Sequence, residues 1–549
     1  MRSARGLMLP LLVGVLVLLY RFNTLGGELG GFDNDHFINV ARANQLLLGE
    51  WPLRDYADAS LQGAWPPLTY LASAAAQIVF GRSLLAEGLL TAGAVAIAAA
   101  LTVIAARELR LPAALAVGAA VVSVLPSVKL YGYARPLLFA LGAVLLFRYV
   151  NLPSTRRLAA LSVLAAIAFL VRHDYALYLA VGIAVTLLVQ HRRTPIQGAA
   201  RLVACGAIAM LLLVPTILGV HYMVGLGSYI EGARALMADE VSRTNLKWPT
   251  FDPTDVWAEQ NVLAWPYYVY LAVPVIAAAA ALVRARHTHD DTELPKVLGI
   301  AAMGALANHF LLRGNLEGRL ADPAVLHALT GVWLIGVAGQ GAARAGSGRT
   351  MRRLAATAAM AIAGVTIVAL GRVGAADREF RTAGFHEGVV TTWKTTVRVI
   401  GRLRDLPPAR WEPLPEDGAM LAAAYLSSCT RPTDRIINAT YNTEFLVFGK
   451  RQFAAGRVNF VPGFYSSPRE QTQAVAVASR QSPPVAFTDP PPDDDWLEED
   501  FPIFNAFLRE RYVNAGTITQ HGEPYLRVLV LRDLPERGTF ASTGLPCFQ

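Results

Sequence analysis

Long apolar runs, separated by short segments that carry most of the charge, dominate the first two thirds of the chain. A helix needs roughly 20 residues to cross the hydrocarbon of a bilayer. The pattern predicts transmembrane cores at residues 7–22, 86–106, 111–128, 134–150, 157–172, 175–190, 199–223, 262–283, 296–313, 323–342 and 354–372. The first run resembles a signal peptide but lacks a small-residue cleavage site, so we interpret it as an uncleaved span.

The apolar stretch 66–80 is treated differently, because it begins with Pro66 and Pro67 and is only about fifteen residues long. We interpret it as interfacial or re-entrant. With eleven spans and a cytoplasmic N-terminus, the cytoplasmic loops are rich in Arg and Lys, as the positive-inside rule expects. These residues are Arg2, Arg5, Arg107, Arg110, Arg156, Arg157, Arg192, Arg193, Arg201, Arg284, Arg286, Lys296, Arg344, Arg349, Arg352 and Arg353. The C-terminus then lies outside; a rival count of twelve would leave it in the cytoplasm.

Composition supports a membrane protein. Charged residues make up 16% of the chain, against about 25% in soluble proteins. The net charge of +8 falls mostly in short loops, so membrane topology explains it without a nucleic-acid partner. We expect a multi-pass protein of the inner cell membrane, with a transmembrane domain at 1–372, a first outer loop at 23–85, and a soluble extracytoplasmic domain at 373–549.

The tail alternates predicted helices with predicted strands, which is typical of an α/β layer domain. Helices are expected at 386–404, 417–428 and 501–512, and strands at 435–439, 485–488 and 525–531. Cys429 and Cys547 could form a disulfide if the tail lies in an oxidising compartment. The predicted fold class is therefore mostly α: a polytopic helical bundle followed by a soluble α/β domain.

The first outer loop begins with two acids, Asp33 and Asp35. An amphipathic pattern follows, which predicts a helix lying in the membrane interface, with Asp33 or Asn34 as its cap. Tyr56, Trp65 and Tyr70 stand at the other end of the loop, around the proline pair. Taken alone, these features also suit a capped helix and a proline-terminated loop with an aromatic anchor.

In their order along the chain, these motifs resemble those of the polytopic GT-C glycosyltransferases, near the bacterial protein O-mannosyltransferases and the lipid A aminoarabinose transferases. Asp33 matches the leading acid of that branch, Ala41-Arg42 its Ala-Arg pair, and Pro66-Pro67-Leu68 with Tyr70 its Pro-Pro-Leu-aromatic stretch. Asn34 departs from the pattern, because the branch commonly has Glu at that place. The resemblance covers roughly residues 1–340 in layout. It implies an inverting transfer of a sugar from a polyprenyl-phosphate donor on the outer face.

Such a reaction needs one base for the acceptor and positive charge beside the leaving phosphate. We expect Asp33 to be the catalytic base. Asp35, the second catalytic candidate, could bind a divalent metal, orient the acceptor, or be solvated. Mg²⁺ or Mn²⁺ at Asp33 and Asp35 is thus possible, but the branch generally works without metal, so we expect no required cofactor.

Three short outer loops carry cations against the positive-inside bias, and together they predict a site for the lipid phosphate. The expected phosphate-binding residues are Lys129, Arg135, Arg172, Arg313, Arg319 and His327. By the family resemblance, Arg313 and Arg319 come first among them. His173 and Asp174 join Tyr56, Trp65 and Tyr70 as expected substrate-loop residues. The alternative is that these cations are snorkelling side chains paired with local acids, such as Arg172 with Asp174.

The expected partners are the bilayer, a polyprenyl-phosphate sugar donor, and an acceptor that could be a glycan, a lipid or a protein. Two other functions remain open: a transporter or flippase for a lipid-linked glycan, and a non-catalytic membrane scaffold. Transporters often contain internal repeats and charges in mid-membrane. This sequence has no clear repeat, and its charges cluster at the span ends, which favours the transferase.

Overall fold

The computed structural model describes residues 5–25, 32, 34–52, 54–56, 67–126, 129, 132–242, 248–287, 292–309, 311–312, 316–343, 349–404, 417–492 and 495–549. The chain divides into two compact units. The bundle unit comprises Met1–Gly31, Gly88–Pro215 and Arg243–Val399. The sheet unit comprises Phe32–Glu87, Thr216–Ser242 and Ile400–Gln549.

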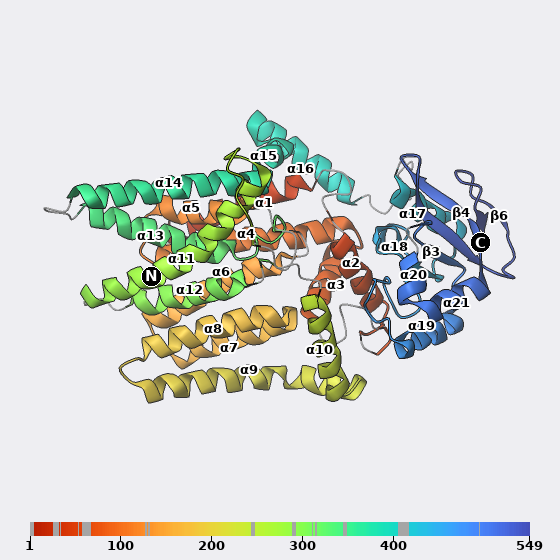
Figure 1. The fold of residues 1–549 in the computed structure, drawn as a ribbon, viewed down its shortest axis with the longest axis horizontal. Coiled ribbons are helices and arrows are strands. Elements are labelled where there is room, and N and C mark those ends of the chain that lie inside the picture. Colours follow the sequence, from red (N-terminus) through yellow and green to blue (C-terminus); the bar gives the residue numbers. More distant parts are fainter. Residues whose placement is uncertain are drawn as a thin grey trace. The chain divides into compact units, whose positions relative to one another are not determined.

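Each of the eleven predicted membrane cores overlaps a helix in the described residues (Figure 1). These helices are α1 (Arg5–Thr24), α4 (Leu84–Glu108), α5 (Ala113–Val124), α6 (Ala134–Asn151), α7 (Thr155–Val171), α8 (His173–Gln190), α9 (Pro195–Met223), α11 (Glu259–His287), α12 (Glu293–Asn308), α13 (Ala324–Ala343) and α14 (Arg349–Val373). Three shorter elements follow them, α15 (Ala376–Thr382), the 3-10 helix Phe385–Glu387 and α16 (Val389–Arg404).

Length and composition qualify fewer of these helices as membrane spans than the sequence predicts. In the described parts of the chain, six helices are long and apolar enough, namely α1, α4, α6, α8, α9 and α11. A seventh is possible if α14 and α15, bent by 58° at their junction, form one span. The other four predicted spans fall on α5, α7, α12 and α13, whose apolar parts are shorter, partly because Pro112 delays the start of α5. The chain is an integral membrane protein, and the count of eleven stays a prediction.

Close helix packing in the bundle depends on glycine at two positions. A Cβ added at Gly182 of α8 would lie 2.3 Å from Met303 Cγ, and one at Gly299 of α12 would lie 2.1 Å from Thr186 Oγ1. Small residues let the backbones of membrane helices approach closely. Helices α8 and α12 therefore pack directly against each other through these glycines.

The sheet unit contains the helices of the first loop as well as the tail. Its helices are α2 (Asn34–Leu47), α3 (Pro67–Phe80), α10 (Leu226–Ser242), α17 (Gly418–Cys429), α18 (Glu444–Phe448), α19 (Pro468–Gln481), α20 (Asp495–Asp500) and α21 (Pro502–Arg511). Its strands are β1 (Arg435–Ala439), β2 (Gln452–Phe453), β3 (Val485–Thr488), β4 (Tyr512–Gln520), β5 (Glu523–Leu531), β6 (Gly538–Thr539) and β7 (Pro546–Cys547). Thus the first loop groups with the tail by its contacts, while the domain boundary expected at 372 stays a prediction.

Five strands form one mixed sheet in the order β2-β1-β3-β5-β4. Strand β1 runs parallel to β2 and β3, while β5 is antiparallel to β3 and β4. The central strands β1 and β3 are almost completely buried, as their nearly continuous apolar runs require. Helices pack on both faces, because Ile437 contacts the α19–α21 side and Phe487 contacts Phe445 of α18. The predicted α/β class of the tail is confirmed.

The last two strands of the sheet are joined by the tight turn His521-Gly522. Both residues have positive φ, 52° and 86°, as a two-residue hairpin turn of type I′ requires. Nearby, Cys429 at the end of α17 and Cys547 in β7 are joined by a disulfide. The disulfide and the backbone bond from Phe548 N–H to the carbonyl of Cys429 fix the C-terminal segment to α17.

The predicted amphipathic helix after the two acids is present as α2, but protein covers its buried face. His36, Phe37, Val40, Ala41 and Arg42 are all buried. Helix α2 packs against α3, α18 and β2 of the same unit. The apolar stripe that predicted a membrane-interface helix is thus used for packing within the sheet unit. Within the stretch 66–80, Pro67–Phe80 forms α3, a helix of 14 residues, which is too short to cross a bilayer alone.

Candidate functional site

Three of the predicted site residues, Asp33, Trp65 and Arg313, lie outside the described residues. The others fall into two groups, a basic group in the bundle unit and an acidic group in the sheet unit. The two groups are built from different elements.

The three cation-bearing loops meet at one end of the bundle. Arg135, in the first turn of α6, forms an ion pair with Asp322 in the turn before α13. Its guanidinium also lies 4.7 Å from the ring centre of Tyr175, near the start of α8. The start of α6, the start of α8 and the α12–α13 connection are therefore in direct contact.

Arg172 completes this basic group from the junction of α7 and α8. Its Nε lies 2.9 Å from Asp174 Oδ1, and its guanidinium is 5.5 Å from the ring centre of Tyr175. Two guanidiniums thus flank one aromatic ring, and each has a carboxylate partner. Such rings hold cations through the negative potential of their faces. We call Arg135, Arg172, Asp174, Tyr175 and Asp322 the Tyr175 cluster.

Two buried polar atoms of the Tyr175 cluster, Arg135 Nε and Asp174 Oδ1, have no hydrogen-bond partner among the described residues. Arg135 is buried, and its Nε–H has no acceptor within hydrogen-bonding distance among the described residues. A buried donor without a partner costs roughly 1–3 kcal/mol. The cluster therefore favours an acceptor that enters from outside the protein, and an oxyanion suits a guanidinium particularly well.

The remaining cations have different surroundings. Lys129 is exposed, and Arg319 is half-buried. The backbone N–H of Asp322 donates to the carbonyl oxygen of Arg319 over 2.9 Å, so both residues belong to one turn. That turn carries the carboxylate partner of Arg135. Arg319 thus lies on the segment that contributes Asp322 to the Tyr175 cluster.

His327 is engaged inside the bundle. It is buried, its Nε2 lies 2.8 Å from Asn308 Oδ1, and its ring stacks on Tyr270 with centres 4.1 Å apart. Asn308 in turn donates to the backbone oxygen of Tyr270. These contacts join the end of α12 to the start of α13 and so close the loop between them. His173 makes a comparable ring contact with Phe169, at 4.3 Å.

The acidic segment Asn34-Asp35 is bound to the tail of the same unit. Asp35 Oδ1 accepts a hydrogen bond of 2.8 Å from the hydroxyl of Tyr441. Asn34 Oδ1 accepts one of 2.8 Å from the backbone N–H of Thr443, and Asn34 Nδ2 donates to the backbone oxygen of Tyr441. The second acid is therefore held by a tyrosine of the tail.

Two expected substrate-loop tyrosines are buried around Arg42. The guanidinium of Arg42 donates to the hydroxyl of Tyr70 over 3.3 Å and lies 5.6 Å from its ring centre. The hydroxyl of Tyr56 donates to the backbone oxygen of Arg42. The Ala-Arg pair and the aromatic residue of the proline stretch, recognised separately as motifs, are thus in contact. These buried contacts of Arg42 with Tyr56 and Tyr70 stabilise the first outer loop.

Sequence reasoning missed a buried polar group beside the acids. His36 Nε2 lies 3.3 Å from Glu87 Oε2, and both side chains are buried. Glu87 also accepts hydrogen bonds from Ser73 and from Gln77 of α3. This group joins α2, α3 and the first turn of α4. The available signal was Glu87 itself, since an acid inside an apolar run is costly unless it is paired.

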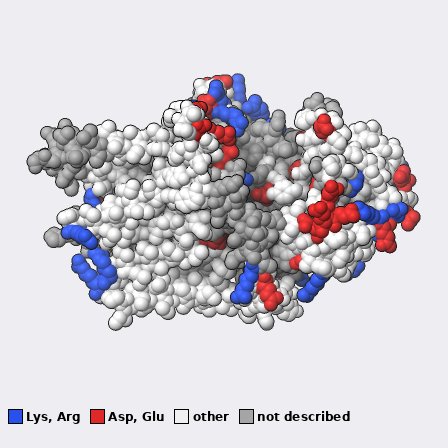
Figure 2. All heavy atoms as spheres, in the orientation of Figure 1, with Lys and Arg blue, Asp and Glu red and all other residues white. Residues whose placement is uncertain are grey.

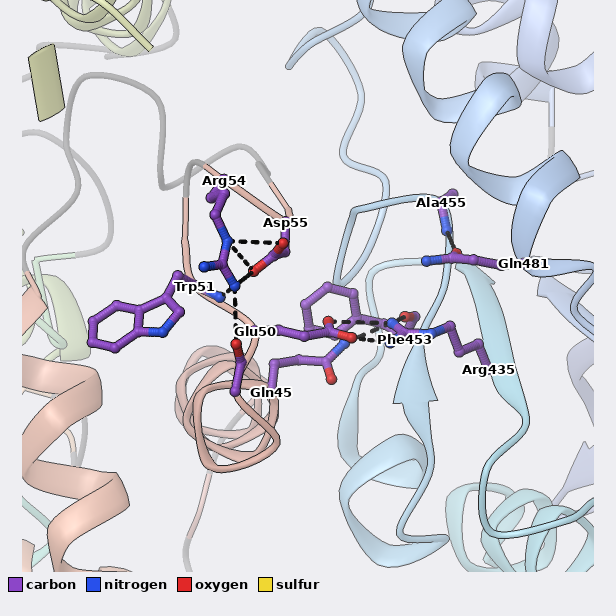
Figure 3. Close-up of polar contacts among 10 residues, drawn as sticks. Gln45, Glu50, Trp51, Arg54, Asp55, Arg435, Phe453, Ala455 and Gln481 are labelled. Carbon is purple, nitrogen blue, oxygen red and sulfur yellow. Dashed lines mark hydrogen bonds and ion pairs between the residues drawn. The ribbon is translucent and has the colours of Figure 1, made fainter. Parts of the chain in front are cut away.

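A surface loop after α2 carries one perturbed acid. Burial alone would raise the pKa of Asp55, but hydrogen bonds from the Arg54 guanidinium and the Trp51 backbone N–H hold it below its usual value (Figure 3). This arrangement fixes the turn that follows α2.

As for metals, the described residues contain no group of three or more His, Cys, Asp and Glu side chains placed to hold an ion.

The charge distribution agrees with a membrane bundle. On the face drawn in Figure 2, a broad surface of the bundle helices is nearly free of Lys, Arg, Asp and Glu, and a group of basic side chains lies at one end. Uncharged surface of this kind faces lipid rather than water.

No family model and no curated protein sequence matches this chain. A solved structure does match: the crystal structure of ArnT from Cupriavidus metallidurans bound to undecaprenyl phosphate. The likeness covers 96% of this chain and 98% of that one, with a TM-score of 0.50 and 12% sequence identity. Since it extends over both units, the expectation from the loop motifs is confirmed at the level of fold. The chain therefore has the fold of that ArnT structure.

Proposed function

We propose that this protein is a membrane glycosyltransferase that moves a sugar from a polyprenyl-phosphate donor to an acceptor on the outer face of the membrane. The Tyr175 cluster would bind the donor phosphate. The observation that carries the proposal is the buried Nε–H of Arg135, which lacks an acceptor among the described residues. The undecaprenyl phosphate bound in the ArnT structure is the kind of ligand that fits this requirement.

The chemistry divides between an anion site and a base. The acceptor oxygen or nitrogen forms a bond to the anomeric carbon of the sugar, while the bond from that carbon to the phosphate oxygen breaks. The polyprenyl phosphate leaves with the bonding electron pair, and the Tyr175 cluster stabilises its charge. Asp33 takes the proton of the acceptor. A single displacement of this kind inverts the anomeric centre.

The carboxylates of the cluster explain how it remains stable before the donor arrives. Asp322 neutralises Arg135, and Asp174 neutralises Arg172. A buried guanidinium without any counter-charge is costly. The phosphate therefore adds to a site whose charges are already balanced. The donor that it gains is the Nε–H of Arg135, which has no acceptor among the described residues.

The anion site is tested with Arg135→Gln in the purified, reconstituted protein. We expect the affinity for undecaprenyl phosphate to fall by at least tenfold, because a charge-assisted hydrogen bond is lost. Arg148→Gln is the matched control, since Arg148 lies exposed on the last turn of the same helix. Equal affinities in the two variants would refute the site.

The base is tested with Asp33→Asn in membranes given labelled polyprenyl-phosphate sugar. We expect transfer to fall by at least a hundredfold, within the range typical of a lost general base, while binding of undecaprenyl phosphate is kept. Normal transfer by a well-expressed variant would rule out Asp33 as the base.

A further inference from the structure

We infer that the loop Thr440–Thr443, which follows β1 in the tail, positions the acidic segment at the start of α2, and that Tyr441 is a positioning residue for the reaction. This inference rests on the proposed function. It gives the soluble tail a part in the reaction, because the tail would hold the acidic segment in place.

Asn34 recognises this loop through both ends of its amide. Its Oδ1 accepts from the backbone N–H of Thr443 over 2.8 Å, and its Nδ2 donates to the backbone oxygen of Tyr441. An ionised Asp or Glu could accept but could not donate, and it would place a negative charge against the carbonyl oxygen. This geometry accounts for Asn34 at the position where the resembling family commonly has Glu.

Asp35 is held by the side chain of the same loop. The Tyr441 hydroxyl donates to Asp35 Oδ1 over 2.8 Å, which is a hydrogen bond to a charged acceptor and stronger than a neutral one. Asn459 also donates to the backbone oxygen of Tyr441, so the loop is tied to its own domain. Three consecutive hydrogen bonds thus link residues 34–35 to residues 441–443.

The loop itself is rigid for local reasons. Asn438, the fourth residue of β1, is buried, and its Nδ2 donates to the backbone oxygens of Asn442 and Val458. Its Oδ1 accepts from the backbone N–H and the hydroxyl of Thr440. These bonds fold residues 440–442 back onto the end of the strand. Glu444 adds a further bond by accepting from the hydroxyl of Tyr525 over 2.7 Å.

The rest of α2 is attached to the same edge of the tail. Phe37 packs edge-on against Phe448 of α18, with ring centres 5.1 Å apart. Figure 3 shows two further attachments near β2: Gln45 donates to the backbone oxygen of Phe453, and Glu50 pairs with Arg435. Helix α2 therefore cannot shift along its axis without disturbing the sheet.

The position of this attachment in the fold is the one that α/β domains use for ligands. Such domains bind them beyond the carboxyl ends of parallel strands, and residues 440–443 follow the carboxyl end of β1, next to parallel β3. Here that place is taken by the start of α2. The tail thus uses its ligand-binding edge to hold the segment adjoining the proposed base.

The first test is a mutant cycle on Tyr441 and Asp35. Tyr441→Phe is expected to lower kcat by about tenfold with little change in the KM for donor, because one hydrogen bond to a charged group is lost. In an Asp35→Asn background the same change should have little further effect. Tyr512→Phe is the control, since its hydroxyl also donates within the sheet unit, to Pro483, but far along the sequence from this loop. A full tenfold loss in both backgrounds, or none in either, would overturn the inference.

A second measurement does not depend on sugar transfer. Asn34→Ala should speed hydrogen exchange of the Thr443 amide, which loses one of its two acceptors and keeps Glu444 Oε2, and Tyr441→Phe should speed exchange in residues 34–40. Exchange in α17 should stay unchanged in both. Failure of the proposed function would appear as an inactive wild-type protein with these exchange effects intact. Unchanged exchange in both variants would overturn the positioning role, whatever the wild-type activity.

Discussion

The guanidinium of Arg135 lies between the carboxylate of Asp322 and the ring of Tyr175, and this placement determines how the pair responds to substitution. Breaking a buried ion pair by removing one partner typically costs about 3–5 kcal/mol, because the other charge stays buried. We therefore expect Asp322→Asn to lower the stability of the protein by about 3 kcal/mol, measured by thermal unfolding in detergent.

An exposed ion pair of the same protein provides the control. Arg509 and Glu498 are paired, with both side chains more than half exposed, and such pairs contribute at most about 1 kcal/mol. Glu498→Gln should therefore change the unfolding midpoint very little. If Asp322→Asn were equally mild, the Arg135–Asp322 pair would not be a stabilising contact.

Two roles are open to His327: packing inside the bundle, or direct binding of the donor phosphate. Its contacts with Asn308 and Tyr270 predict that His327→Ala destabilises the bundle by about 2–4 kcal/mol through lost packing and a lost hydrogen bond. His327→Gln, which can still reach Asn308, should recover part of that loss and keep donor affinity. A stable Gln variant with weakened binding of undecaprenyl phosphate would instead favour the direct phosphate contact expected from the sequence.

Single site residues could be predicted from the sequence only where a charged residue occurs in a segment that usually lacks that charge. Arg135 and Arg172 stand on loops where the topology expects few cations, so they were nominated. The pairing of Arg135 with Asp322 was not predictable, because the two lie on different loops and nothing local relates them. The His36–Glu87 pair was missed because Glu87 was counted within an apolar run.

At the scale of elements, α19 offers a clear test of local sequence signals. Ser467 accepts from the backbone N–H of Glu470, and Glu470 accepts from the backbone N–H of Ser467, which is a complete capping box. We expect Ser467→Ala to lower the stability of the tail by about 1 kcal/mol. Thermal unfolding monitored by a probe in the tail would measure it.

The control for this prediction lies one turn further along the same helix. Thr472 is exposed, and its hydroxyl donates to the backbone oxygen of Pro468 in the preceding turn, so Thr472→Ala should be nearly neutral. An equal effect of the two substitutions would mean that the capping box contributes nothing beyond the hydroxyl group.

Elements were predictable where one physical signal dominated. The strands β1 and β3 are buried on both faces, so their apolar runs marked them with correct bounds. Strand β4 was missed because exposed Asn514 and partly buried Gly516 interrupt its pattern at a register shift. The four shorter bundle helices were predicted as spans because their sequences are apolar. Apolar character does not show where a helix begins and ends, so the sequence did not reveal how short they are.

At the scale of the whole molecule, the Cys429–Cys547 disulfide reports the side of the membrane on which the tail lies. Disulfides persist in oxidising compartments, so eleven spans with an outside tail predict that both thiols resist maleimide until a reductant is added. Twelve spans with a cytoplasmic tail predict labelling without reductant. Mass spectrometry of the labelled protein from intact cells would distinguish the two topologies.

The same disulfide closes a long loop, with a sequence separation of 118. Replacing both cysteines by serine should lower the stability of the protein by about 4–5 kcal/mol in the chain-entropy account. Cys205→Ala, which changes the buried free cysteine in α9, is the control for the loss of a thiol alone.

The grouping of the first loop with the tail could not be read from the sequence. Composition changes sharply near residue 372, so a domain boundary was expected there. That boundary stays a prediction, while contacts group Phe32–Glu87 with the unit that contains the tail. Such long-range pairing depends on complementary surfaces, here Phe37 with Phe448 and Gln45 with Phe453, and a single sequence carries no local record of them.

The packing of the first loop on β2 and α18 has a practical consequence for anyone who wishes to study the tail as a water-soluble fragment. Phe448 and Phe453 are buried, and they pack against Phe37 and Tyr56 from the loop. A recombinant piece covering 400–549 would expose these rings and would tend to precipitate. Grafting residues 32–56 onto it through a flexible glycine-serine tether would restore their cover, and would give crystallographers a detergent-free sample that retains both acids.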